Sequence, residues 1–209
     1  MTQYGFYVNT EICTGCKACM TACMDRNDLA GDEKIRKVYE FAGGDYTLDE
    51  NGAYANTAFA YYVSLTCQQC DNPACVAACP TGAMQKYADG IVRSDHEVCI
   101  GCGSCATACP YGHPFVSAEL KKSIKCVLCT DEASEDGVPH PACATACPVR
   151  ALEFGPIDKL REKYGDTCTI AIFGDETAPN VVINPHRDAS KGGELMNPAE
   201  VGMGDLEHR

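Results

Sequence analysis

Residues 99–110 read CIGCGSCATACP, and this stretch decides how the rest of the chain is interpreted. Its cysteines follow the spacing C-x2-C-x2-C-x3-C, and a proline comes directly after the last one. Residues 13–23 repeat the same spacing near the N-terminus. Bacterial two-cluster ferredoxins bind their cubane iron–sulfur clusters with this ligand run. The repeat therefore predicts that both stretches supply thiolates to [4Fe–4S] clusters.

Two further runs of four cysteines extend the pattern with altered spacing. Together the four runs, here called quartets, use sixteen of the seventeen cysteines and leave only Cys168. The quartets are Cys13, Cys16, Cys19 and Cys23; Cys67, Cys70, Cys75 and Cys79; Cys99, Cys102, Cys105 and Cys109; and Cys126, Cys129, Cys143 and Cys147. At four thiolates per cubane, the sequence predicts four [4Fe–4S] clusters. A row of clusters is a route for electrons, so the count indicates electron transfer.

Disulfides and zinc are the competing uses of so many cysteines. Cysteines at i, i+3 and i+6 aim several sulfurs at one point, which separate disulfide bridges do not require. Zinc ribbons favour two C-x2-C pairs separated by a spacer. A third cysteine three residues on, and then a fourth followed by proline, is typical of iron–sulfur proteins. The pattern favours iron–sulfur clusters, and a zinc-held interaction module remains the alternative.

Composition narrows the class of protein further. The chain of 209 residues has only six Phe and no Trp, so we expect clusters to fill part of the core and the apo chain to be largely unfolded. The formal charge of −12 argues against nucleic-acid binding, which needs a basic surface. The acidic excess favours a solvated surface or a docking face for a partner protein.

The sequence shows neither a secretory signal nor a membrane span. The N-terminus lacks a basic region followed by an apolar one, and no apolar run reaches about eighteen residues. We therefore expect the protein to fold in the cytoplasm and to lie at the periphery of the cytoplasmic membrane, with export by a partner as the alternative.

The quartets form an internal repeat, which predicts an α+β fold of two nested two-cluster ferredoxin-like units. The inner unit spans residues 67–119, with a hairpin at Asp89-Gly90 between its quartets. The outer unit is split by this insertion into residues 1–23 and 120–155. The prolines that follow Cys79, Cys109 and Cys147 redirect the chain after the last cysteine of each run.

The remaining segments carry no quartet. Residues 24–66 are predicted to form a connector with a small antiparallel sheet, whose turns are Gly43-Gly44-Asp45 and Asn51-Gly52. Residues 131–139 are acidic and predict an exposed loop.

The C-terminal region, 156–209, is predicted to be a helix followed by an extended tail for partner docking. Pro156 and Gly165 punctuate the helix, and Ile157, Leu160 and Tyr164 share one face. The tail contains the short β run Val181-Val182-Ile183 and is expected to be disordered or to lie across a partner.

No catalytic motif accompanies the cysteines. The sequence lacks a dinucleotide-binding glycine loop and a phosphate loop, so we predict no catalytic residues. His113 is expected to be a surface or packing residue. Lys121, Lys122 and Lys125 are expected on a solvated face, with docking or cluster tuning as the alternative. Cys168 precedes a predicted strand at 169–173 and is expected to be a small buried hydrophobe.

With the quartets placed, the chain resembles the iron–sulfur electron-transfer subunits of the dimethyl sulfoxide reductase family, within the molybdopterin oxidoreductases. The resemblance runs nearly end to end and includes segments between the quartets. These segments are Gln3-Tyr4-Gly5-Phe6, Cys13-Thr14-Gly15-Cys16-Lys17, Tyr39-Glu40-Phe41-Ala42-Gly43-Gly44-Asp45, Phe59-Ala60-Tyr61-Tyr62, Cys99-Ile100-Gly101-Cys102, Cys109-Pro110-Tyr111-Gly112 and Phe154-Gly155-Pro156-Ile157-Asp158.

The resemblance implies a ligand set and partners. It assigns cluster 1 to Cys13, Cys16, Cys19 and Cys147; cluster 2 to Cys23, Cys126, Cys129 and Cys143; cluster 3 to Cys67, Cys70, Cys75 and Cys109; and cluster 4 to Cys79, Cys99, Cys102 and Cys105. Cluster 1 would face a large molybdopterin catalytic subunit, and cluster 4 a membrane anchor that oxidises quinol. Some relatives replace one ligand with Trp, whereas here all sixteen are Cys.

One departure limits what carries over. This chain has Gly103-Ser104 between two cysteines of the third quartet, where dimethyl sulfoxide reductases carry Arg-Tyr. This difference lies beside the cluster nearest the implied quinol site, so the electron donor and the membrane anchor carry over less directly. Relatives of this branch serve catalytic subunits with different substrates, so the substrate does not carry over. A stand-alone polyferredoxin, or the electron-transfer subunit of another complex such as formate dehydrogenase or hydrogenase, remains the alternative.

Overall fold

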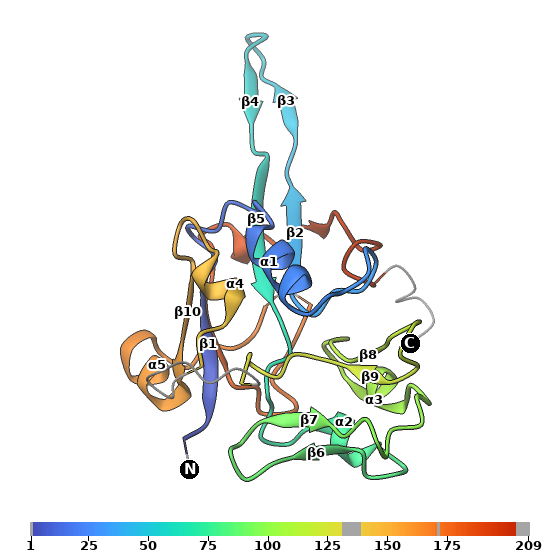
Figure 1. Cartoon of the computed structure of the whole chain (residues 1–209). Helices are drawn as coiled ribbons and strands as arrows, with labels where there is room; N and C mark the ends of the chain where they lie inside the picture. Colours follow the sequence, from blue (N-terminus) through green and yellow to red (C-terminus); the bar gives the residue numbers. More distant parts are fainter. Residues whose placement is uncertain (1, 131–138, 171, 204–209) are drawn as a thin grey trace.

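Short helices and small β-sheets make up the chain in a computed structural model, which describes residues 2–130, 139–170 and 172–203 (Figure 1). The helices are α1 (Ala18–Arg26), α2 (Ala74–Ala77), α3 (Ser104–Ala108), α4 (Ala142–Thr145), α5 (Ile157–Tyr164) and the 3-10 turn η1 (Ala189–Lys191). The mixed α+β class is the one that the sequence predicts. The acidic loop predicted at 131–139 lies, apart from Pro139, outside the described residues. Within the described ranges, no helix is long and apolar enough to cross a membrane.

A three-stranded sheet joins the two ends of the chain. Its central strand β1 (Tyr4–Asn9) pairs antiparallel with β10 (Leu152–Pro156) and parallel with β11 (Val181–Asn184). Both faces of β1 are buried, since α5 covers one face and the main core lies on the other. The rings of Tyr7 and Tyr164 stack with centroids 3.6 Å apart. The predicted helix and its apolar face are thus confirmed.

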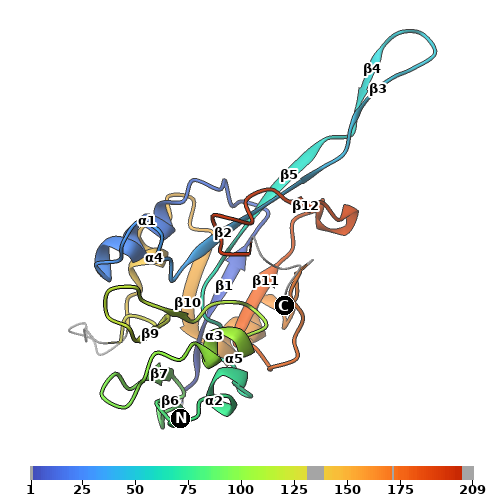
Figure 2. The same cartoon turned by 90° about the vertical axis from the view of Figure 1, so that its right-hand side faces the viewer.

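A second sheet is built from the connector. Strand β2 (Lys37–Gly43) pairs antiparallel with β5 (Phe59–Leu65), and β12 (Glu194–Leu195) adds to the other edge of β2. The pairing of β2 with β5 runs on in the same register into β3 (Tyr46–Leu48) and β4 (Tyr54–Asn56). These two strands project far from the body as a narrow ribbon (Figure 2). We call residues 44–58 the arm.

The two predicted connector turns have different outcomes. Asn51-Gly52 is the tip of the arm, where Gly52 has a φ of 76°. The prediction of a turn at Gly43-Gly44-Asp45 is wrong, because the strand passes through this point without reversing. Gly44 has a φ of 81°, and a Cβ there would lie 2.1 Å from the carbonyl oxygen of Thr57. The glycines therefore permit a close approach of two strands and not a reversal.

The helices that carry cysteines pack in pairs. α1 packs against α4, which brings the first quartet to the fourth, and α2 packs against α3, which brings the second to the third. Strands β6 (Met84–Lys86) and β7 (Val92–Ser94) form the predicted hairpin, in which the Tyr87 amide donates to the carbonyl of Ile91 at 3.0 Å. A second short hairpin, β8 (Phe115–Val116) with β9 (Ser123–Ile124), precedes the fourth quartet.

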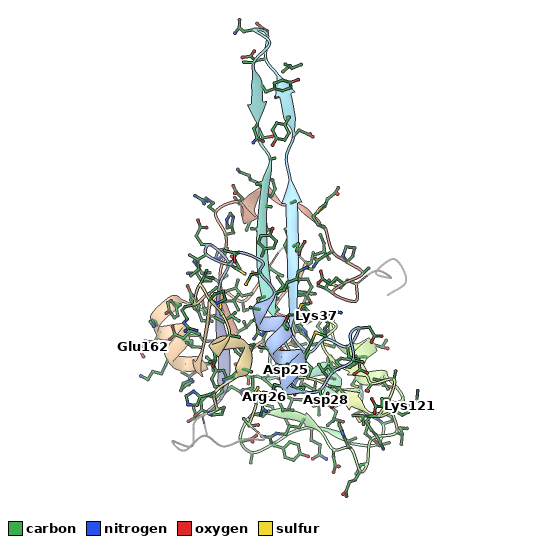
Figure 3. The ribbon with its side chains drawn as sticks, turned by 45° about the horizontal axis from the view of Figure 1, so that its top comes forward. Asp25, Arg26, Asp28, Lys37, Lys121 and Glu162 are labelled. Atoms are coloured by element: carbon green, nitrogen blue, oxygen red, sulfur yellow. The ribbon has the colours of Figure 1, made fainter. Side chains whose placement is uncertain are left out.

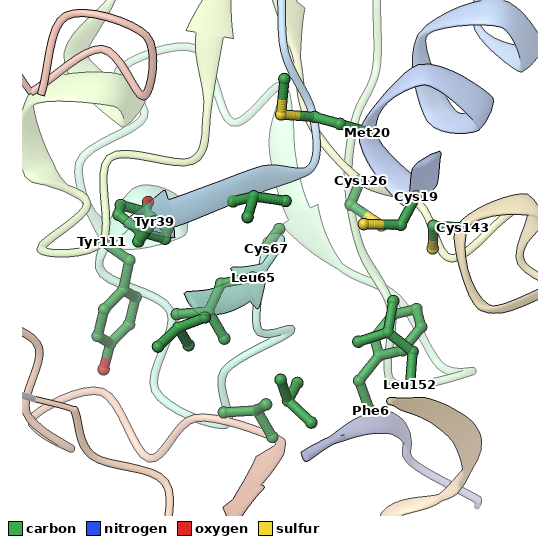
Figure 4. Close-up of a cluster of buried hydrophobic side chains, with 14 of the residues drawn as sticks. Phe6, Cys19, Met20, Tyr39, Leu65, Cys67, Tyr111, Cys126, Cys143 and Leu152 are labelled. Carbon is green, nitrogen blue, oxygen red and sulfur yellow. The ribbon is translucent and has the colours of Figure 1, made fainter. Parts of the chain in front are cut away.

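Cysteines form a large part of the main core. Figure 4 shows sulfur-bearing side chains among the apolar ones, with Cys19, Cys126 and Cys143 close together. The core also takes in aromatic side chains of both sheets, such as Phe6 of β1 and Tyr39 of β2. The interior is thus arranged around thiols.

The C-terminal tail departs from its expectation. Residues 181–203 are neither extended away from the chain nor without structure, because β11 and β12 extend the two sheets and Val201 is fully buried. Asn197 fastens this segment to β2: its side-chain oxygen accepts from the Glu40 amide at 3.0 Å, and its side-chain nitrogen donates to the Val38 carbonyl at 2.9 Å. The strand predicted at 169–173 is also wrong, since its described residues form only an isolated bridge between Ile170 and Phe173.

Replacement of Asn197 by Ala should loosen the C-terminal segment, because it leaves a strand amide and a strand carbonyl without partners. The expected cost is about 1–3 kcal/mol, most of it local to residues 181–203. Limited trypsin digestion measures it, and cleavage after Lys191 should be at least roughly tenfold faster than in the unaltered chain. Asn51→Ala at the exposed arm tip is the matched control, and equal cleavage rates for both variants would refute the assignment.

Candidate metal centres

One cavity is lined by Cys79, Cys99, Cys102 and Cys105, which we call the fourth group. The first of these comes from the second quartet and the other three come from the third. Backbone amides point at two of the sulfurs: Met84 donates to Cys79 Sγ at 3.3 Å, and Ser123 donates to Cys99 Sγ at 3.4 Å. The Ser123 hydroxyl lies 3.2 Å from Cys105 Sγ. The group therefore has thiols facing one space and polar hydrogens facing the thiols.

A neighbouring cavity is lined by a third group of thiols. Its members are Cys67, Cys70, Cys75 and Cys109. The hydroxyl of Thr177 donates to Cys70 Sγ at 3.1 Å, and the buried ring of His113 lies on the cavity wall with both nitrogens lacking a hydrogen-bond partner.

The first group gathers around the packed pair α1 and α4. Burial raises the pKa of Cys13, a hydrogen bond from the Gly15 amide lowers it, and three neighbouring thiols raise it further. Those neighbours are Cys19, Cys147 and Cys16. Three cysteines of the first quartet thus lie with the last cysteine of the fourth.

The second group draws on the same pair of helices, with Cys23 in α1 and Cys143 in α4. Burial raises the pKa of Cys23 to about 12, and the thiols of Cys126, Cys143 and Cys129 contribute to the rise. Burial likewise raises the pKa of Cys126 to about 11. The structure therefore collects the sixteen quartet cysteines into four groups, each drawn from two runs.

The two runs with identical spacing also share a backbone conformation. Gly15 and Gly101 have φ values of 66° and 68°, and two residues later Lys17 and Gly103 have values of 61° and 79°. This left-handed conformation curls each loop around its sulfurs and starts the helix that follows. At Lys17 the conformation is held by ion pairs of its side chain with Glu40 at 2.8 Å and Glu200 at 2.6 Å.

The donor set fits [4Fe–4S] clusters. All four groups receive at least one hydrogen bond to sulfur: besides the bonds above, the Ala151 amide donates to Cys147 at 3.2 Å and the Leu128 amide to Cys126 at 3.4 Å. Such bonds stabilise thiolates and help to set the reduction potential of a bound cluster. Among the described residues, no three or more His, Cys, Asp or Glu side chains form a site for a single metal ion.

Solvent reaches the cysteines unevenly. Of all seventeen, only Cys16 in the first group and Cys102 in the fourth are exposed. Cys168 belongs to none of the groups and is half-buried, so its expected full burial is not found. Two of the groups therefore open to the surface through a single cysteine each.

Several polar residues lie around the groups. Lys125 is buried and not on the expected solvated face: its ammonium donates to the carbonyls of Cys126 and Val92. Its position directly before Cys126 is the sequence signal behind the alternative of cluster tuning. Arg36 and Thr177 lie far from any quartet in sequence, and no pattern indicates that the fold carries them to the thiols.

Comparisons with known proteins agree with this geometry. A family model described as a 4Fe-4S dicluster domain matches residues 58–157, and a 4Fe-4S binding domain model matches residues 10–24. The probable anaerobic dimethyl sulfoxide reductase subunit YnfG of Escherichia coli K12 is 46% identical, and the B subunit of anaerobic dimethyl sulfoxide reductase from the same organism is 45% identical; each alignment covers 96% of this chain and 99% of the relative.

The corresponding B subunit of Haemophilus influenzae is 44% identical, over 96% of this chain and all of the relative. At 34–36% identity, matches over about three quarters of this chain are named as subunits of a sulfite dehydrogenase, a thiosulfate reductase and a polysulfide reductase. These relatives are electron-transfer subunits of oxidoreductase complexes and not catalytic enzymes by themselves. The chain belongs to the family of iron–sulfur subunits represented by the B subunit of anaerobic dimethyl sulfoxide reductase.

Proposed function

We propose that this chain holds four [4Fe–4S] clusters, one in each group, and passes electrons to a molybdopterin catalytic subunit of a dimethyl sulfoxide reductase-like anaerobic reductase. The electrons come from a quinol-oxidising membrane partner or from another donor. The observation that carries the proposal is the arrangement of the groups in a row, with an exposed cysteine in each terminal group. In this account the nested ferredoxin-like units are the frame that holds the row.

The mutual influence of thiols in different groups supports an order for the row. Cys19 of the first group acts on the pKa of Cys143 in the second, which burial raises, and Cys67 of the third acts in the same way on Cys126 of the second. The third and fourth groups share a small core, in which Cys75 and Cys105 pack with Met84 and Val92. The order is therefore first, second, third, fourth.

A bound cubane supplies one-electron chemistry, because it takes up and releases a single electron. The chain's own residues bury most of the thiols, direct amides and hydroxyls at them, and leave only Cys16 and Cys102 at the surface. Electrons can then enter and leave at two separate places. By the family resemblance, the first group faces the catalytic subunit and the fourth faces the donor.

The arm favours a complex over a freely diffusing carrier. Its pairing places Tyr46, Leu48 and Tyr54 on one face of the ribbon, and these side chains are 68%, 62% and 74% exposed. An isolated two-stranded ribbon is marginal in water, and a contiguous exposed apolar face marks an interaction site. The arm starts beside the first group, because the Gly15 loop lies against Tyr62 of β5. We therefore assign the arm to the catalytic partner.

Chain purified without oxygen should contain about sixteen iron atoms and matching acid-labile sulfide. Serine at any quartet position should lower the iron content, because it removes a thiolate from one cluster. Cys168→Ser is the matched control and should keep the full content. Iron assay and electron paramagnetic resonance after dithionite reduction measure the outcome, and zinc without sulfide would end the electron-transfer account.

Cys102→Ser should damage the terminal cluster of the fourth group and cut turnover driven by the natural donor by at least roughly tenfold. Activity with an artificial donor that reaches the catalytic subunit directly should fall much less, because the first group is untouched. Both activities are measured on the same purified complex. Equal losses in the two assays would contradict the order of the row.

Tyr46→Ser, Leu48→Ser and Tyr54→Ser together should weaken binding of the catalytic subunit by at least tenfold, as expected when exposed anchors of an interface are removed. Thr47→Ser with Ala55→Ser, on the opposite face of the ribbon, should leave binding unchanged. Quantitative pull-down with a tagged chain measures both. Unaltered retention of the large subunit by the triple variant would remove the arm from this interface.

A further inference from the structure

The charges of this protein are segregated between surface and interior. The chain carries a formal charge of −12, yet no Asp or Glu is buried anywhere in its described part. Carboxylates such as those of Asp25, Asp28 and Glu162 lie on the outside (Figure 3). The buried charged side chains are all basic, namely Arg36, Lys37 and Lys125. An interior of this kind is suited to hold negative charge.

Arg36 is the most deeply buried of the three bases. Its side chain is 1% exposed, and its guanidinium lies over the ring of Phe6, 4.5 Å from the centroid. Nη1 donates to both the carbonyl and the hydroxyl of Ser64, each at 3.1 Å. Nε and Nη2 are buried and make no hydrogen bond of ordinary geometry, although the side chain lies near enough to Cys143 to lower the pKa of that thiol. Among the ion pairs of the described residues, none joins a carboxylate to this side chain. Several N–H donors are therefore left unused on a permanent cation.

A buried cation in this state requires an anion. Transfer of an unpaired charge out of water costs far more free energy than a single contact gives back. Arg stays charged in the interior because it does not lose its proton. Unsatisfied buried donors add to the cost. The neighbours of Arg36 must therefore supply both the negative charge and the hydrogen-bond acceptors.

Those neighbours are the thiols of two groups. The Ser64 hydroxyl that accepts from Arg36 lies 3.2 Å from Cys19 Sγ of the first group. Burial lowers the pKa of Arg36, and four thiols outweigh it, so that the pKa is raised. In order of their influence these are Cys143, Cys19, Cys126 and Cys23. One belongs to the first group and three belong to the second.

We propose that Arg36 is the shared counter-ion of the first two clusters, donating its free N–H groups to their sulfur atoms and holding both reduction potentials up. The inference rests on the proposed four clusters. When a cluster takes up one electron from its neighbour, its charge becomes one unit more negative, and Arg36 keeps its proton throughout. A fixed positive charge therefore favours the reduced form of either cluster. Because the two clusters share the charge, it raises both reduction potentials together. The difference between the two potentials, which governs electron exchange between the clusters, therefore changes little.

Redox titration of the complete chain, followed by electron paramagnetic resonance, tests this proposal. In Arg36→Met two of the four midpoint potentials should fall, each by at least a tenfold change in the reduction equilibrium, which is about 59 mV for one electron. Arg36→Lys keeps the charge and should recover most of the shift. Lys34→Met is the matched control, because Lys34 lies two residues before Arg36 but at the surface, where its ammonium donates to the Gly31 carbonyl.

The outcomes separate this inference from the proposed function. Four cluster signals with unaltered midpoints in Arg36→Met overturn the counter-ion and leave the four-cluster account standing. A shift of the same size in Lys34→Met also overturns it, because the loss of any nearby positive charge would then explain the fall in potential. If Arg36→Met does not fold, Arg36→Gln replaces it, because Gln removes the charge and keeps a polar side chain. A fall in two midpoints then supports the proposal, and four unaltered midpoints refute it.

Discussion

The fold depends on the convergence of sulfur atoms from opposite ends of the chain. Cys13 lies beside Cys147, and Cys23 beside Cys126 and Cys143, because α1 packs against α4. Thiols alone provide a poor reason for this convergence, because they are small and their ionised forms are unfavourable here. Burial raises the pKa of Cys23 to about 12, and repulsion from neighbouring thiols adds to the rise. A metal centre that bonds all four sulfurs reverses the sign of the interaction and makes the closed arrangement favourable.

The buried bases impose the same dependence by another route. Arg36 has no carboxylate partner among the described residues, and Lys125 is satisfied by carbonyl groups. Without anionic centres these charges oppose folding, and with them they are neutralised. Loss of the centres would thus remove both the cross-links and the compensating charge. The acidic exterior and the basic interior therefore have complementary roles. The surface charge favours solubility, and the buried bases compensate the negative charge of bound clusters.

Local patterns in the sequence predicted what depends on local geometry. The equal spacing of residues 13–23 and 99–109 appears in the structure as equal backbone conformation, and the Asp89-Gly90 hairpin and the helix ending at Gly165 also form as predicted. Some predictions failed because they depended on distant contacts. The tail is expected to be disordered or to lie across a partner, but β11 pairs with β1 and Asn197 bonds to β2. The turn expected at Gly44 is a close approach to Thr57, which a glycine pair does not distinguish from a reversal. Arg36 carries no signal, because a basic residue after an acidic stretch resembles any surface position.

The two surface openings differ in chemistry, and this difference is consistent with a proposed row of clusters that has two unlike ends. Around Cys16 the loop is fixed by Lys17 between Glu40 and Glu200, and the acidic, aromatic arm begins close by. Around Cys102 the flanking residues Gly103 and Ser104 are small, and Ile100 is 66% exposed. Small residues let another backbone approach the sulfur closely, whereas a long arm reaches over a large partner. A protein that passed electrons between two identical partners would not need two surface openings of different chemistry. The geometry thus favours two different binding partners. The arm contacts one of them at the first group, and the other approaches the fourth group closely.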